Sequence, residues 1–165
     1  MKTTITAATL VALSANTSAK NIETSIVINA TPEKVWTVFS NFSEYPLWNP
    51  FVKSFKGAPK VGQKIEVDLP GMKFKPTVLA YNTNRELRWK GKFLFRGLFD
   101  GEHYFKLIDN GNGTTTFIQG EYFNGLLLPL FSSMLQNKTK PGFEEMNEKL
   151  KIRVEQTLSQ TQQHE

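Results

Sequence analysis

The chain has 165 residues, enough for one domain with a real core, and its 39% apolar and 21% charged residues are typical of globular proteins. Its net charge of +5 is not gathered in any Lys/Arg-rich run, so no nucleic-acid partner is predicted. The absence of cysteine excludes disulfides, thiol nucleophiles and cysteine-ligated metals.

The first 19 residues have the pattern of a secretory signal peptide. Lys2 is followed by a short apolar stretch and then by small residues up to Ala19. The stretch is too short and too rich in threonine to span a bilayer. We therefore expect a protein exported to the periplasm or secreted, with cleavage after Ala19. If the stretch is instead a first strand or a tail, the protein is cytoplasmic.

The expected domain covers residues 20–158 and begins with a strand and short helices. An apolar run at 22–29 predicts the strand. Thr31 and Pro32 suit the N-cap and the first position of a helix, and apolar residues at helical spacing follow up to Phe42. Residues 43–46 end or restart this helix.

An antiparallel sheet with one solvated face is predicted next. Apolar and polar residues alternate through 51–55, 65–69, 73–80 and 86–93, with turn residues between these segments. Two longer strands follow.

The last two strands are predicted at 99–108 and 114–123. The loop DNGNG between them favours a hairpin centred near Asn112. This register places six residues on one face, as the pairs His103–Glu121, Phe105–Gln119 and Leu107–Phe117.

Residues 126–158 predict a helical end to the domain, followed by a polar tail at 159–165. Its apolar residues form two stripes at spacings of three and four. The stripes are Leu127, Leu130, Phe131, Met134 and Leu135, and then Phe143, Met146, Leu150 and Val154. Pro141 lies between them. Because proline inside a helix costs about 3 kcal/mol, we expect a kink or a new helix start there.

This order of elements, with several short sequence segments, resembles the START-like (SRPBCC, or Bet v 1-like) superfamily, and more narrowly its polyketide cyclase/dehydrase and lipid-transport branch. The segments are 30–36 (ATPEKVW), 45–51 (YPLWNPF), 97–103 (GLFDGEH), 113–116 (GTTT), 123–127 (FNGLL) and 142–147 (GFEEMN). The resemblance implies an α+β helix-grip fold, in which a curved antiparallel sheet of about seven strands wraps around a long C-terminal helix and leaves an apolar cavity. Pro141 departs from the family, whose long helix tends to be continuous.

The residue pattern also favours a cavity, because the inward faces carry more Phe and Leu than one helix can cover. The chain holds 13 phenylalanines. The residues expected to bind a ligand are Trp48, Phe51, Trp89, Phe99, His103, Phe105, Phe117, Gln119, Glu121, Phe123, Met134, Phe143 and Met146. For Trp48 the alternative is a structural role in anchoring the junction between helix and strand, and for Trp89 the alternative is a place in the core.

His103 and Glu121 are the sharpest candidates for chemistry. A carboxylate beside an imidazole stabilises its charged form and suits a general acid/base pair or the binding of a polar ligand group. The alternative is a hydrogen-bonded pair with a structural role. The sequence holds no metal-binding or cofactor motif, so neither metal nor cofactor is expected.

Two apolar runs, 93–99 and 126–131, suggest a ligand gate or a transient membrane contact, or else they pack on the end of the sheet. Three functions remain open. The first is non-catalytic binding or transport of a lipid, an isoprenoid or a polyketide-like compound. The second is an enzyme of the cyclase, dehydratase or hydrolase type that uses His103 and Glu121. The third is a protein-interaction module like the family's Hsp90-activator relatives, against which an export signal argues.

Overall fold

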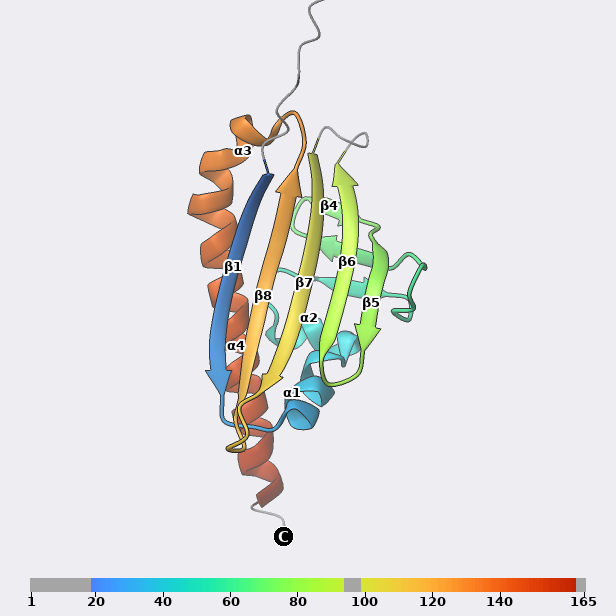
Figure 1. Ribbon diagram of the computed structural model, residues 1–165. Helices are drawn as coiled ribbons and strands as arrows, with labels where there is room; N and C mark the ends of the chain where they lie inside the picture. The colour runs from blue at the N-terminus through green and yellow to red at the C-terminus, as the bar shows by residue number, and fades with distance from the viewer. Residues whose placement is uncertain (1–18, 94–98, 163–165) are drawn as a thin grey trace, which may run out of the picture.

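The protein folds as two antiparallel sheets with a long C-terminal helix (Figure 1). The computed structural model describes residues 19–93 and 99–162. The expected signal peptide therefore lies outside the described residues, apart from Ala19, and so does most of the apolar run at 93–99.

The larger sheet forms one wall of the molecule. Its strand order is β1-β8-β7-β6-β5, and every neighbouring pair is antiparallel. The strands are β1 (Ala19–Ile28), β5 (Thr77–Asn82), β6 (Glu86–Phe93), β7 (Phe99–Asp109) and β8 (Thr115–Asn124). The predicted hairpin register is confirmed, because His103 pairs with Glu121 across β7 and β8.

A smaller sheet faces the larger one and contains β2 (Ser54–Lys56), β3 (Glu66–Leu69) and β4 (Met72–Phe74). The sequence predicted one strand over 73–80, but the structure divides this segment between β4 and β5, which belong to different sheets. Pro76 lies at the division, and it has no N–H to donate to a ladder. The described residues therefore form eight strands in two sheets, where about seven in one sheet were expected.

The connection from β1 to β2 holds three short helices. They are α1 (Pro32–Phe39), the 3₁₀ helix η1 (Phe42–Glu44) and α2 (Tyr45–Trp48). Helix α1 starts at Pro32 as predicted and buries Val35, Trp36 and Phe39 against the sheet. Phe39 lies 5.4 Å from the Phe117 ring between centroids, so α1 closes this end of the interior.

The C-terminal segment contains α3 (Leu128–Met134), a π-helical turn η2 (Leu135–Thr139) and α4 (Lys140–Gln162). A kink or a new helix start was predicted at Pro141. In the structure α4 begins at Lys140 directly after the π-helical turn, so the chain stays helical from Leu128 through the proline. Helix α4 runs behind β1 and β8 (Figure 1). It buries Met146, Leu150 and Val154, which belong to the predicted second stripe. The helix continues through Gln162, so its end lies within the segment expected to be a polar tail.

One polar contact ties α4 to the sheet. The amide nitrogen of Asn147 donates to the hydroxyl of Thr24 at 2.9 Å, and that hydroxyl lies 3.4 Å from the Gln119 carbonyl oxygen. These groups are buried. The predicted α+β fold, with its curved sheet and long closing helix, is thus confirmed.

Candidate functional site

A cavity of about 1350 Å³ lies between the two sheets and the C-terminal helices. Both sheets and segments from α2 to α4 contribute side chains to it. Of the residues predicted to bind a ligand, those that line it are Phe51, Trp89, His103, Phe105, Gln119, Glu121, Phe123, Met134, Phe143 and Met146. The structure therefore brings most of the predicted set together around one space.

Three predicted residues are not placed in this lining. Phe117 is fully buried between Phe39 and Phe105, because α1 fills the end of the sheet where it lies. Trp48 is buried at the end of α2 and packs against Tyr45, with the ring centroids 4.9 Å apart, a position that suits its alternative role at the junction between helix and strand. The side chain of Phe99 lies outside the described residues.

The apolar run at 126–131, predicted as a gate or a membrane contact, has some side chains inside the protein and others exposed to solvent. Leu128 is buried and Phe131 lines the cavity, whereas Leu130 is 77% exposed. Within the described residues, no helix is both long and apolar enough to cross a membrane.

His103, Gln119 and Glu121 form a polar cluster on the cavity wall. Nδ1 of His103 lies 3.2 Å from Oε2 of Glu121, and Nε2 of His103 lies 3.2 Å from Nε2 of Gln119. The Gln119 amide can present either its nitrogen or its oxygen to Nε2. The nitrogen would donate to a neutral ring protonated on Nδ1, and the oxygen would accept from a ring protonated on both nitrogens. Both ring nitrogens are thus engaged by protein groups.

Aromatic rings surround the His103 imidazole. Trp89 stacks on it at 5.3 Å between centroids, and Phe105 and Phe143 lie at 4.6 and 4.9 Å. The side chains of His103 and Glu121 are only 11% and 17% exposed. The cluster is therefore a small polar region in a mostly apolar wall, suited to orient one polar group of a ligand.

Sequence reasoning missed several polar residues of the lining. They are Tyr45, Asn49, Lys64, Lys73, Lys75, Thr77, Lys90, Lys92, Asp100, Lys138 and Thr139. Tyr45 and Asn49 are buried. They lie four residues apart, on and just after the single turn of α2, and this i, i+4 spacing places them on one helical face. The spacing was present in the sequence, but a one-turn helix gives no periodic pattern from which an inward face can be predicted.

Further apolar lining residues that were not predicted come from the small sheet and its flanks. They are Val52, Phe55, Val67, Leu69, Met72 and Phe74. The alternation of apolar and polar residues in these segments was recognised, but it did not show that the segments form a separate sheet facing the first.

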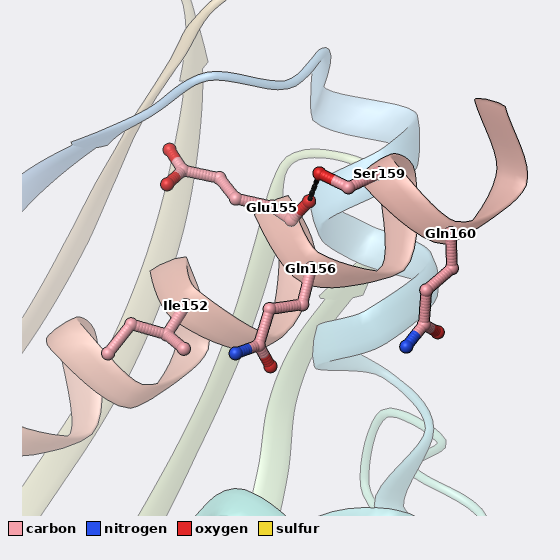
Figure 2. A pocket seen from close by; sticks show the side chains of 5 residues that line it. All are labelled: Ile152, Glu155, Gln156, Ser159 and Gln160. Atoms are coloured by element: carbon pink, nitrogen blue, oxygen red, sulfur yellow. Dashed lines mark hydrogen bonds between the residues drawn. The ribbon is translucent and has the colours of Figure 1, made fainter. Parts of the chain in front are cut away.

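A second depression lies on the surface of α4, far along the chain from this cluster. Figure 2 shows its five lining side chains, Ile152, Glu155, Gln156, Ser159 and Gln160, with the Ser159 hydroxyl donating to the Glu155 carbonyl at 3.0 Å. All five come from one helix. The surface of a single helix can cover only one side of a ligand, whereas the cavity surrounds it. We therefore place the candidate ligand-binding site in the cavity.

Comparisons with known proteins agree with this architecture. The solved structures that resemble it include a START superfamily protein from Mycobacterium smegmatis, with 19% identity, a TM-score of 0.67, and coverage of 83% of this chain and 98% of that one. An aromatase/cyclase from Streptomyces sp. R1128 has 10% identity and a TM-score of 0.67, covering 86% and 96%. Norcoclaurine synthase from Thalictrum flavum, in complex with dopamine and hydroxybenzaldehyde, has 14% identity and a TM-score of 0.65, covering 94% and 98%.

Because these sequence identities are below 20%, the similarity to solved structures establishes the fold alone. The same fold occurs in enzymes and in other proteins. The search of curated proteins gives no match. The sequence model of one family, described as polyketide cyclase/dehydrase and lipid transport, matches residues 19–155. The chain therefore belongs to the polyketide cyclase/dehydrase and lipid transport family.

Proposed function

We propose that this protein binds a small, largely apolar ligand in the cavity without transforming it. The observation that carries the proposal is the cavity itself, about 1350 Å³ in volume and lined mainly by aromatic and aliphatic side chains. Burial of apolar ligand surface supplies about 25 cal/mol per Å², so such a wall can bind a lipid, an isoprenoid or a polyketide-like compound.

The state of His103 supports binding over catalysis. A general base needs a ring nitrogen with a free lone pair near the substrate. Here both ring nitrogens of His103 are already engaged by protein groups, Nε2 by the Gln119 amide and Nδ1 by the Glu121 carboxylate. In this arrangement the cluster can position a polar group, but the imidazole has no free lone pair for proton transfer.

An enzymatic function is the second candidate, and one observation favours it. His103 and Glu121 form a contact in the wall of a cavity large enough for a substrate. If a substrate displaced Gln119, the imidazole would gain a free Nε2 and could act with Glu121 as an acid/base pair. The neighbouring folds of an aromatase/cyclase and of norcoclaurine synthase are compatible with this alternative.

Native mass spectrometry of the purified protein separates the two functions. We expect the wild type and Glu121→Gln to carry the same small molecule, with the same mass, because a binding protein leaves its ligand unchanged. A different mass in Glu121→Gln would indicate a trapped substrate and would support the enzyme. A protein that carries no small molecule, and takes up no apolar probe such as anilinonaphthalene sulfonate, would contradict the proposal.

Glu102→Gln provides the matched control for this experiment. Glu102 precedes His103 on β7 and is bound by Arg88 at 2.7 Å, and it is absent from the cavity lining. Like Glu121→Gln, this replacement removes one carboxylate charge, here from the neighbouring strand. We expect the mass and the amount of bound ligand to remain at the wild-type values in this control.

A further inference from the structure

The charged residues of the cavity lining are separated by sign. Within the described part of the chain, its acidic residues are Asp100 and Glu121, and the side chains of both are largely buried. Its basic residues are all exposed lysines, namely Lys64, Lys73, Lys75, Lys90, Lys92 and Lys138. A residue that lines the cavity and is also exposed lies where the cavity meets solvent. The mouth of the cavity is therefore positively charged, whereas the acidic groups lie further in.

The lysines reach the mouth from both sheets and from η2. Lys64 bridges to Thr77, which in turn pairs with Lys90, so these two lysines lie on one face of the sheet about 10 Å apart. Lys75 forms an ion pair with Glu66 at 3.0 Å. Within the described residues the other lysines of the mouth have no ion-pair partner, so their ammonium groups are available to an anion.

Lys138 is the lysine that the helical pattern places on the cavity wall. It belongs to a stripe of lining residues at spacings of three and four, whose other members are Phe131, Leu135, Gly142 and Met146. A lysine at such a boundary packs its stem against the apolar wall and keeps its ammonium group at the surface. Lys138 therefore joins the apolar interior to the charged mouth.

The backbone around Lys138 is irregular. It lies in the π-helical turn η2, where the N–H of Lys140 donates to the carbonyl of Leu135. Such turns are rare and are frequently found at functional sites. Thr139 follows in the same turn, lines the cavity and is only partly buried. Its hydroxyl has no hydrogen-bond partner within the described residues and is not among the polar atoms shut off from solvent, so a group in the mouth can reach it.

We infer that the ligand is an amphiphilic anion whose carboxylate is held at the mouth by Lys138 and Thr139, with its apolar chain in the cavity. The ammonium and hydroxyl groups each donate a hydrogen bond to the carboxylate, and the other lysines attract the same charge. Glu121 on the inner wall opposes the reverse orientation, because it would repel an anionic head group. This inference rests on the proposed binding function and assigns the chemistry of the ligand's head group.

The test compares an acid with its neutral amide. Dansylaminoundecanoate and its primary amide share one apolar body and one fluorophore, and they differ in the charge of the head group. Fluorescence titration of the full chain should show that wild type binds the acid more tightly, with a preference that shrinks at high ionic strength. Lys138→Gln should weaken binding of the acid roughly threefold to tenfold and leave binding of the amide unchanged. Lys138→Arg, which keeps the charge, should bind the acid like wild type.

Lys149→Gln is the matched control. Lys149 is an exposed lysine of α4 that does not line the cavity, and it lies about 16 Å further along the helix, roughly twice the screening length at physiological salt. Its replacement removes the same charge, and we expect both probes to bind as they do in wild type. Because both lysines are exposed, neither replacement by glutamine should move the urea midpoint.

The outcomes distinguish this inference from the proposed function. Equal affinity of wild type for the acid and the amide overturns the anionic head group but leaves an apolar binding protein. A preference for the acid that Lys138→Gln and Lys149→Gln retain to the same degree overturns the role of Lys138. If the two probes bind equally while the protein floats with phosphatidylglycerol vesicles, the lysines serve an anionic membrane surface and the inference also fails. If wild type binds neither probe nor any other apolar molecule, the binding function itself fails.

Discussion

Two glycines of the β7–β8 hairpin test how firmly the protein holds Glu121 and Tyr104. A Cβ added at Gly101 would lie 2.2 Å from Oε1 of Glu121. A Cβ added at Gly120 would lie 2.3 Å from both Cζ and the hydroxyl oxygen of Tyr104. Both distances are far below van der Waals contact, so the side chain must move in each alanine variant.

The two movements differ in cost. In Gly120→Ala the Tyr104 ring must leave its bond to Glu23 and its stacking on Tyr122, whose centroid is 5.1 Å away. Overpacking costs about 1–3 kcal/mol, loss of a hydrogen bond to a charged group about 1.5–3, and replacing a strand glycine returns about 0.5–1. The net loss of stability is roughly 2–5 kcal/mol.

In Gly101→Ala only the end of a flexible side chain must move. The Glu121 carboxylate can turn into the cavity, and its contact with His103 is lost. This hydrogen bond to a carboxylate contributes about 1.5–3 kcal/mol, of which the replacement of glycine returns about 0.5–1. Stability should therefore fall by about 0.5–2.5 kcal/mol, less than in Gly120→Ala, while the polar cluster is broken.

Urea unfolding followed by tryptophan fluorescence measures both stabilities. The ¹⁵N chemical shifts of the His103 ring report whether Nδ1 still donates to Glu121. The reasoning is refuted if the two variants lose similar stability, or if Gly101→Ala leaves the His103 signals unchanged. The first result would mean that Glu121 is as rigid as Tyr104, and the second that the added methyl group does not reach it.

Two further predictions concern pH and the N-terminus. The raised pKa of Tyr45 means that the folded state favours the neutral hydroxyl, whereas an unfolded tyrosine ionises at about pH 10. This contribution to stability is complete below about pH 10 and is lost as the pH rises towards the folded pKa, so the free energy of unfolding should fall more steeply with pH in wild type than in Tyr45→Phe. Separately, sequencing of exported protein should begin at Lys20, and an intact Met1 would contradict the signal peptide.

The β7–β8 hairpin shows what the sequence could predict. The turn residues of the DNGNG loop, together with strict alternation on both strands, allowed a single register that buried the apolar set. That register alone placed His103, Gln119 and Glu121 side by side. Because the polar cluster depends on a local hairpin, its geometry followed from local information.

The opposite wall of the cavity depends on tertiary packing. The strand predicted over 73–80 satisfied the period of two, and within it Pro76, which has no N–H for a ladder, marks the point of division. Tyr45 and Asn49 lie on and after one turn of α2, whose inward face is decided by the small sheet and the aromatic rings around it. No pattern within the segment specifies that choice, so these two residues could not be assigned to the site beforehand.

The fold treats the buried hydroxyls of Tyr45 and Tyr104 differently. The Tyr104 hydroxyl is paired, whereas the Tyr45 hydroxyl has no hydrogen-bond partner among the described residues. Both tyrosines are fully buried, and the fold satisfies the hydroxyl of Tyr104 with Glu23 on the outer face. An unpaired buried donor costs about 1–3 kcal/mol, so phenylalanine at position 45 would give a more stable free protein.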